Sequence, residues 1–316
     1  MSKKAAAAFL KTHNDFLLIA HVSPDGDTLG SCLCLYQALL QLDKRVQLAC
    51  EEPVPPLYAF LPHADTVKLP SAVGPFSAIV FLDCADLARA GDLAPLLGTA
   101  QHSLCIDHHQ TNPGFAQVNW IARVSSTGEM IFSLLEAMDI PVTPDMAACL
   151  YTAISTDTGN FSYANVSPDT FRIAARLLER GLDLPELNRR LFRCVLKKKT
   201  RLVGVVINNL EFLADGRFAL STVSRTELKR WDATGEDCEG LIDHLRDIQG
   251  VEVSCLLRES IDGQIRVSLR SLRHLDVSRI AADLGGGGHR RAAGITLPGP
   301  MEQAKARMTE AISQWM

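Results

Sequence analysis

Acidic and histidine side chains gather directly after three short apolar segments of this chain, and both residue types bind divalent cations. They are His21, Asp25 and Asp27 after the first segment, Asp83 at the end of the second, and Asp107, His108 and His109 at the end of the third. Carboxylate oxygens suit hard cations, and imidazole adds a preference for Mn, Zn or Fe over Ca. A single such carboxylate is more often a solvated loop residue or a helix cap, but this repetition predicts a metal centre.

The elements that must position these groups are short strands alternating with helices. The strand candidates are Asp15–His21, Arg45–Cys50, Ala78–Asp83 and Ser103–Asp107, and Thr28–Leu42 has apolar residues at helical spacing. Continuous apolar strands separated by helices indicate a parallel sheet that is covered on both faces. Loops from neighbouring strands converge at the carboxyl edge of such a sheet, where ligands bind. The fold class predicted for this half is therefore α/β, with the metal centre at that edge.

A further carboxylate, Asp157, follows a helix predicted to start after Thr143-Pro144, and we expect it to return to the same edge. Six ligands are more than one ion needs, which favours two ions about 3.5–4 Å apart with a bridging carboxylate and hydroxide. Gly26 allows a turn from which Asp25 and Asp27 project toward different ions. Ser126-Thr127-Gly128-Glu129 has the spacing of a capping box and predicts another helix start. Neither a Gly-x-Ser-x-Gly nucleophile elbow nor a P-loop is present.

The C-terminal half contains a run of glycines, Gly285–Gly288, followed by His289. A glycine run alone resembles a flexible linker or a turn with a surface histidine. This one follows a predicted helix, and backbone amides without side chains can bind a phosphate. Arg270 and Ser271 end the preceding predicted strand, and Arg270 has the fork of donors that fits a phosphate. The run therefore predicts a second, phosphate-binding site.

Length and composition fit two domains of a globular protein. The chain has 316 residues, of which 47% are hydrophobic and 22% charged. In the second half of the chain, apolar and polar residues alternate as they do in half-exposed strands, unlike in the earlier strands. The strands predicted there are Arg217–Val223, Val251–Arg258 and Gln264–Ser271. The stretch Leu184–Asn209 reads as a basic helical connector. We expect a catalytic domain over residues 1–185, a helical linker over 186–209 and a substrate-binding domain over 210–316.

The net charge and the cysteines indicate which kinds of ligand and which cell compartment suit the protein. The formal net charge of -4 argues against a protein that coats long nucleic acids, but a small anionic ligand stays open. The nine cysteines are odd in number and form no Cys-x-x-Cys pair, which indicates a reducing compartment. Polar residues from Lys11 interrupt the apolar start of the chain too early for a signal peptide. These observations predict a cytoplasmic protein without membrane association.

Five motifs together carry a family resemblance. The chain resembles the DHH phosphoesterase family, in the branch with the DHH-associated C-terminal domain, through HVSPDGDTLGS, FLDCAD, DHH, STDTG and GGGGHRRAAG. The motifs stand in family order over almost the whole chain. Within the family the chain is most similar to short bacterial oligoribonucleases that also remove a phosphate from 3′-phosphoadenosine 5′-phosphate. One departure concerns Asp86, because close relatives often carry Asn or Arg soon after the position of Asp83, and its role stays open.

The resemblance implies two metal ions, usually manganese, with Asp83 bridging them. The ligands implied for the first ion are His21, Asp25 and Asp83, and those for the second are Asp27, Asp83, His108 and Asp157. His109 would face the scissile phosphate, and Asp107 would orient His108. The substrate contacts implied in the C-terminal domain are Arg270, Ser271, Gly286, Gly287, Gly288 and His289.

The function expected from this resemblance is hydrolysis of short oligonucleotides to mononucleotides, and of 3′-phosphoadenosine 5′-phosphate to AMP, in a cleft between the two domains. A bridging hydroxide would attack phosphorus in line. Three alternatives stay open: a phosphodiesterase for cyclic or linear dinucleotides, a RecJ-like single-strand DNA exonuclease, and a catalytically dead nucleotide- or RNA-binding protein. No obligate protein partner is indicated, and a homodimer is left open.

Overall fold

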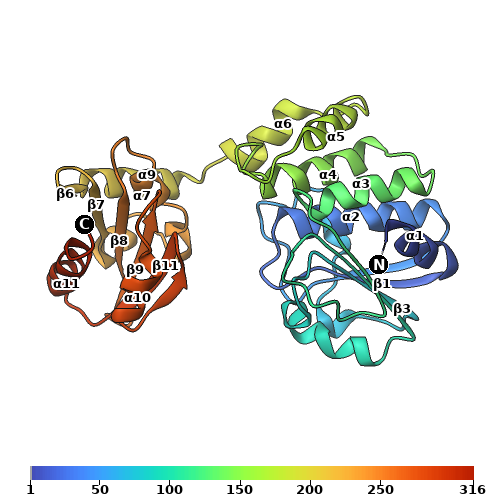
Figure 1. The fold of residues 1–316 in the computed structure, drawn as a ribbon, viewed down its shortest axis with the longest axis horizontal. Helices are drawn as coiled ribbons and strands as arrows, with labels where there is room; N and C mark the ends of the chain where they lie inside the picture. Colours follow the sequence, from blue (N-terminus) through green and yellow to red (C-terminus); the bar gives the residue numbers. More distant parts are fainter. Residues whose placement is uncertain (1) are drawn as a thin grey trace. The chain divides into compact units, whose positions relative to one another are not determined.

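The computed structural model describes residues 2–316. The chain divides into two compact units, Met1–Cys194 and Val195–Met316 (Figure 1). Each unit has its own sheet and its own buried apolar clusters. No helix in the described residues 2–316 is both long enough and apolar enough to cross a membrane.

The first unit is built on a five-stranded sheet in the order β2-β1-β3-β4-β5, in which every neighbouring pair is parallel. Its strands are β1 (Asp15–Ile19), β2 (Arg45–Ala49), β3 (Ala78–Leu82), β4 (His102–Asp107) and β5 (Val118–Ile121). The predicted parallel α/β sheet is confirmed. Strand β5 was not among the predicted elements, because Val118–Ile121 is short and buries only Trp120.

Helices cover both faces of this sheet. They are α1 (Lys3–Thr12), α2 (Gly26–Gln41), η1 (Ala64–Thr66), η2 (Pro70–Ala72), η3 (Leu87–Gly98), α3 (Thr127–Ala137), α4 (Pro144–Asp157), α5 (Pro168–Leu178), α6 (Leu184–Asn188) and the π-helical η4 (Arg189–Arg193). Along β1, Phe16 and Leu18 pack toward the cluster with α2, α3 and α4, whereas Leu17 and Ile19 pack toward η3. Because both sets are buried, the strand is apolar without alternation.

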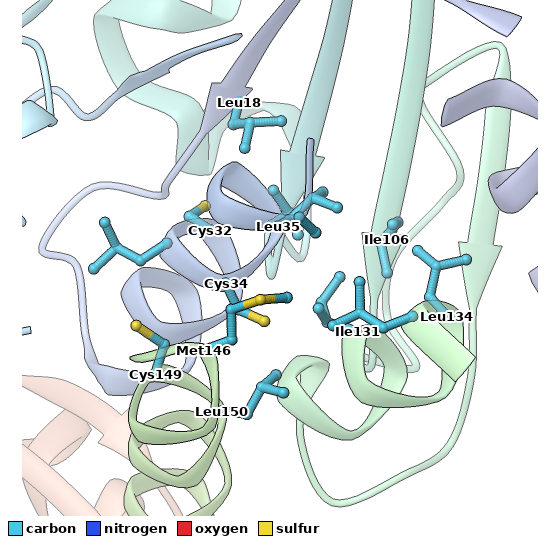
Figure 2. Close-up of a cluster of buried hydrophobic side chains, with 14 of the residues drawn as sticks. Leu18, Cys32, Cys34, Leu35, Ile106, Ile131, Leu134, Met146, Cys149 and Leu150 are labelled. Atoms are coloured by element: carbon cyan, nitrogen blue, oxygen red, sulfur yellow. The ribbon is translucent and has the colours of Figure 1, made fainter. Parts of the chain in front are cut away.

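Close packing of α2 against α4 brings the start of α2 to the end of α4. A Cβ on Gly30 would lie 2.3 Å from the carbonyl oxygen of Cys149, and one on Gly26 would lie 2.3 Å from Thr156 Oγ1. Any larger residue would force the helices apart. Figure 2 shows the apolar side of this contact, with Cys32, Cys34 and Leu35 of α2 among labelled residues of α3, α4 and the sheet. This packing therefore places Asp157, the last residue of α4, near Asp25 and Asp27 at the start of α2.

The second unit contains a six-stranded mixed sheet in the order β10-β11-β9-β8-β7-β6, in which only β7 and β8 are parallel. Its strands are β6 (Glu211–Leu213), β7 (Phe218–Val223), β8 (Val253–Glu259), β9 (Ile265–Ser271), β10 (Gly287–His289) and β11 (Ala292–Leu297). The predicted strands correspond to β7, β8 and β9. Half of the glycine run forms the edge strand β10, so the expected phosphate loop is in part a strand.

The helices of the second unit pack in two apolar clusters. They are α7 (Lys197–Asn208), α8 (Arg225–Arg230), η5 (Glu236–Cys238), α9 (Asp243–Arg246), α10 (Val277–Asp283) and α11 (Met301–Ser313). Helices α7, α8 and α9 pack in one cluster, and α10 and α11 pack in another. The predicted continuous helix Leu184–Asn209 is wrong in one respect, because residues 194–196 are not helical. The functional division into 1–185, 186–209 and 210–316 and the cleft stay predictions.

Candidate metal centre

Asp83 stands at the centre of the predicted site. It follows β3 directly, is buried, and has a left-handed backbone with φ of 61°. Its Oδ2 lies 3.5 Å from His21 Nε2, and its Oδ1 lies 3.4 Å from His108 Nε2. Aspartate tolerates the left-handed region better than most residues. One carboxylate therefore faces an imidazole on each side, as a bridging ligand must.

Two groups of ligand atoms flank Asp83. In the first, His21 Nε2 lies 3.6 Å from Asp25 Oδ1 as well as near Asp83. In the second, His108 Nε2 lies 3.7 Å from Asp27 Oδ2 and 3.7 Å from Asp157 Oδ2. The structure thus brings together the six side chains predicted as metal ligands. Asp83 also shares a third group with His108 and His109, and its Oδ1 lies 3.7 Å from His109 Nδ1.

These distances fit donors that would share a cation. They are longer than the roughly 2.7–3.2 Å of a hydrogen bond. Donors that each lie about 2.0–2.2 Å from one ion stand about 3–3.6 Å apart at ordinary coordination angles. The donors in each group all lie within 4.8 Å of one another. Imidazole nitrogen and carboxylate oxygen together suit a divalent transition metal.

The electrostatics of the cluster lead to the same conclusion. Burial raises the pKa of Asp27 well above its usual range, and the nearby carboxylates of Asp83, Asp157 and Asp25 raise it further. Burial also raises the pKa of Asp157, to about 6, against the opposing effect of His108, and the carboxylates of Asp83 and Asp25 raise it further. Burial lowers the pKa of His21, but the nearby carboxylates of Asp25 and Asp83 outweigh this effect and raise that pKa to about 9. Divalent cations would replace these protons and relieve the repulsion.

Metal binding is therefore expected to tighten as pH rises. Below about 6, Asp157 holds a proton, and below about 9, His21 holds one, so binding must release protons in this window. In the metal-free chain the raised pKa of His21 means that its stabilising contribution is complete below 6.5 and is lost toward pH 9. Likewise, the raised pKa of Asp157 means that its stabilising contribution is complete below 3.8 and is lost as the pH rises to about 6.

Thermal unfolding from pH 5.5 to 9, with EDTA or with saturating Mn²⁺, checks this expectation. The melting temperature with EDTA should fall toward high pH, and the increase caused by Mn²⁺ should grow. Isothermal titration at pH 7.5 should show release of about one proton, chiefly from His21. A Mn²⁺ effect that shrinks as pH rises would contradict the assignment of these ligands.

The start of α3 holds two of the carboxylates in place. The backbone amides of Thr127 and Gly128 donate to Asp27 at 2.7 and 2.9 Å, and the Thr127 hydroxyl donates to Asp83 Oδ1 at 2.9 Å. Amides at a helix start favour an anion. The helix start was predicted from the sequence, but these contacts were not. The only signal in the sequence was the capping pattern Ser126-Thr127-Gly128-Glu129. Such a pattern predicts where a helix starts, but it does not predict which carboxylate its first amides bind.

His109 and Asp107 form a pair beside the ligands. Asp107 is fully buried and its Oδ1 lies 2.8 Å from His109 Nδ1, while Asn112 donates to Asp107 Oδ2 at 2.7 Å. The hydrogen bond with Asp107 raises the pKa of His109 against the opposing effect of burial. The expectation that Asp107 orients His108 is wrong, because His108 Nδ1 instead faces the carbonyl of Val124 at 3.3 Å.

Asp86, whose role was open, is a helix cap. Its side chain accepts a hydrogen bond from the Arg89 amide at 3.1 Å and so caps η3. The turn brings the Arg89 guanidinium to 3.0 Å from His21 Nδ1, which also lies 2.8 Å from the carbonyl oxygen of Val22. Arg89 therefore places a positive charge next to the first ligand group, a contact that was not predicted from the sequence.

The residues predicted to contact substrate lie in the second unit. Arg270 and His289 are on the same face of the sheet, because both align with Ala292 across β11. Ser271 lies on the other face, where it is buried and its hydroxyl donates to the Arg290 carbonyl at 3.4 Å. The structure therefore brings Arg270 and His289 to one surface and leaves the Ser271 side chain out of it.

Gly286 directly precedes the edge strand β10, and Gly287 and Gly288 are its first two residues. A Cβ on Gly286 would lie 2.2 Å from the carbonyl oxygen of Gly294, and one on Gly288 would lie 2.5 Å from that of Ala292. Gly288 also has a φ of 146°. These two glycines are needed for close strand pairing, whereas Gly287 is exposed with free space around it. An exposed glycine edge leaves backbone amides accessible to an anion.

Comparison with known proteins finds relatives over nearly the full chain. Residues 15–154 match the DHH family, N-terminal domain, and residues 215–316 match the DHHA1 domain. A Thermus thermophilus protein named bifunctional oligoribonuclease and PAP phosphatase NrnA is 34% identical, covering 98% of this chain and 93% of the relative. A Bacillus subtilis protein of the same name is 25% identical, covering 91% of each.

Among solved structures, one of an exopolyphosphatase-related protein from Bacteroides fragilis has a TM-score of 0.87 at 28% identity. The match covers 99% of this chain and 96% of that one. The similarity therefore extends over both units and is not confined to the metal centre.

Proposed function

The chain belongs to the DHH family and carries its DHHA1 domain, and from this premise we propose that it is a phosphoesterase. The proposed reactions are hydrolysis of short oligonucleotides to mononucleotides and of 3′-phosphoadenosine 5′-phosphate to AMP. One observation carries the proposal: Asp83 faces an imidazole with each of its two oxygens, between two groups of ligand atoms. That arrangement suits two cations acting on one phosphate.

His21, Asp25 and Asp83 would hold one ion, and Asp27, Asp83, His108 and Asp157 the other. When bound, such ions neutralise the phosphate and lower the pKa of water, which is the chemistry a phosphodiester needs. We propose manganese, since the ligand set mixes imidazole with carboxylates. A cytoplasmic location is proposed on the cysteines, which are all free in the described residues.

The protein's own contribution is positioning and proton transfer. The Asp107 pair holds His109 with its Nδ1 occupied, and the ring is 43% exposed, so its other nitrogen is available to a ligand. We propose that His109 contacts the scissile phosphate and donates a proton to the leaving oxygen. In the second unit, Arg270 and His289 are proposed to bind another part of the substrate.

The substrate is tested with purified protein, Mn²⁺ and four substrates in parallel. These are a dinucleotide RNA, 3′-phosphoadenosine 5′-phosphate, a cyclic dinucleotide and a long single-stranded DNA. We expect turnover of the first two, with kcat falling as RNA lengthens from two to about twenty nucleotides. Highest turnover of the cyclic dinucleotide or of the DNA would replace the proposal with the corresponding alternative. Binding without turnover under any divalent metal would indicate a catalytically dead protein.

A further inference from the structure

A second group of arginines lies on the same sheet face as Arg270 and His289. Along β9 the side chains alternate: Ile265, Val267 and Leu269 are buried, whereas Arg266 is exposed and Arg270 is half-buried. The buried set packs in the cluster with α10 and α11. The other set therefore lies on the opposite face of the sheet, away from α10 and α11.

The strand register places these side chains in two rows. In the first row His289, Ala292 and Arg270 align across β10, β11 and β9. In the second row Thr296, Arg266 and Arg258 align across β11, β9 and β8. Arg266 precedes Arg270 by four residues, so the rows lie about 13 Å apart at roughly 3.3 Å per residue. We call the surface formed by Arg258, Arg266, Ser268, Arg270 and His289 the arginine face.

Small residues occupy the space between the two rows. Gly287, Gly294 and Ser268 align across the three strands. Gly287 and Gly294 are exposed and Ser268 is half-buried. No bulky side chain from these strands therefore stands between the rows, and an extended ligand has a level surface from one to the other.

The pairing of Arg258 with Arg266 is unusual because like charges directly opposite in an antiparallel pair destabilise a sheet. Among residues 2–316, neither guanidinium forms an ion pair with a carboxylate. The Arg258 guanidinium lies against Gly235, where a Cβ would be 2.0 Å from its Nη1. Two aligned guanidinium groups without a carboxylate partner are suited to an anion from outside the chain.

A cavity of about 740 Å³ adjoins this row. It is lined by four basic side chains and two acidic ones, which are Arg225, Lys229, Arg258, Arg266, Glu259 and Asp262. The two acids are held by the local backbone: Glu259 accepts from the Arg225 amide, and Asp262 accepts from the Gln264 amide. Four positive charges against two negative ones leave the lining net positive. The exposed side chain of Ile261 adds an apolar surface that a nucleobase can cover.

We propose that the arginine face is an extended single-stranded RNA site, in which Arg258 and Arg266 bind a phosphate farther along the strand than the one bound at Arg270 and His289. The inference rests on the proposed function and deepens it. A dinucleotide is too short to reach both rows, whereas an RNA of several nucleotides spans them. Arg258 and Arg266 therefore increase the affinity for RNA longer than a dinucleotide and leave dinucleotide binding unchanged.

The test measures RNA binding by the full chain in EDTA, so that hydrolysis does not interfere. The probes are a six-nucleotide oligoadenylate and a 5′-phosphorylated diadenylate, titrated calorimetrically into wild type and the double variant Arg258→Gln/Arg266→Gln. We expect the double variant to bind the hexamer about tenfold or more weakly and the dinucleotide within about twofold of wild type. The slope of log K against log salt for the hexamer should fall by about 0.7, the change expected for one lost phosphate contact.

Two further variants test whether hexamer binding depends on the position of Arg258 and Arg266 or only on the total positive charge of the protein. Arg307→Gln removes an exposed arginine on α11, which packs on the opposite face, and it should leave hexamer binding unchanged. Gly235→Ala keeps every charge but displaces the Arg258 guanidinium, and it should weaken the hexamer alone. Gly235 has a φ of -60°, so alanine fits the backbone and folding is preserved.

The inference is overturned if wild type binds hexamer and dinucleotide equally, if the double variant loses affinity for both, or if Arg307→Gln has the same effect. Hydrolysis assays with Mn²⁺ keep the two proposals apart. If no substrate is hydrolysed but the double variant still loses hexamer affinity, the proposed function fails and the RNA site stands. If the dinucleotide is hydrolysed and hexamer binding is unaffected in the variant, the RNA site fails alone.

Discussion

Asp83→Asn is expected to lower Mn²⁺-dependent hydrolysis of a dinucleotide by at least about a thousandfold. Its two carboxylate oxygens face His21 and His108, so the substitution removes an anionic ligand from both groups at once. Asparagine tolerates the left-handed backbone at this position, and its side-chain oxygen can still accept from Thr127. Folding should therefore be retained, and the loss should be one of metal binding and charge.

Asp86→Asn is the matched control, because Asp86 lies three residues away and caps η3. Asparagine is an equally good cap, so both activity and stability should be close to wild type. Metal content, measured by atomic emission after dialysis, should fall in Asp83→Asn and remain unchanged in Asp86→Asn. A fully active Asp83→Asn variant would remove the observation on which the proposed function rests.

The first sheet was predictable because its central strands are continuous runs of apolar residues. Leu17 and Ile19 pack on one face, and Phe16 and Leu18 on the other, so β1 is an unbroken apolar run. Such runs mark buried parallel strands, and the ligands follow from where the runs end. The site was therefore visible in the sequence as a pattern of strand ends.

Contacts between elements were less predictable. Asp157 is the last residue of α4, and it reaches the centre because Gly26 and Gly30 let α2 approach α4 closely. Nothing in the local sequence of α4 specifies that approach. In the same way, Asp27 accepts from the start of α3, a hundred residues away in the chain. Local patterns predict which elements form, but contacts at this sequence separation depend on how the elements pack.

The glycine run illustrates a different limit. Four successive glycines indicate freedom of the backbone, and the sequence alone does not distinguish a loop from a strand. Gly286 and Gly288 are required because β10 pairs tightly with β11, which is a constraint on space. Ser271 was misjudged for a related reason. Its neighbour Arg270 is on the surface, and alternation along β9 puts the next side chain inside.

Replacing His109 with glutamine is expected to lower kcat for a dinucleotide by about a hundredfold or more, which is typical for loss of a general acid. His109 is bonded to Asp107 through Nδ1, which leaves its other nitrogen for the leaving oxygen. His102→Gln is the matched control, since His102 begins β4 at the end opposite to His109. Its activity should match wild type.

The chemical role of His109 is tested by changing the leaving group. A p-nitrophenyl nucleotide ester expels a stable anion that needs no proton, so His109→Gln should lose far less activity on it than on a dinucleotide. Equal losses on both substrates would mean that His109 binds the phosphate without transferring a proton. Metal content should be unchanged, because Nδ1 is occupied by Asp107.

Asp107→Asn completes the series, because the buried Asp107 carboxylate is what raises the pKa of His109. An acid must be protonated to act, so a raised pKa keeps His109 active to higher pH. Without the carboxylate the pKa falls, and the alkaline limb of the kcat profile should move to lower pH. Asn112 remains available to hold the new amide through its own side chain. A shift to lower pH in Asp107→Asn, with loss of the same limb in His109→Gln, would assign that limb to His109 and make Asp107 its positioning residue.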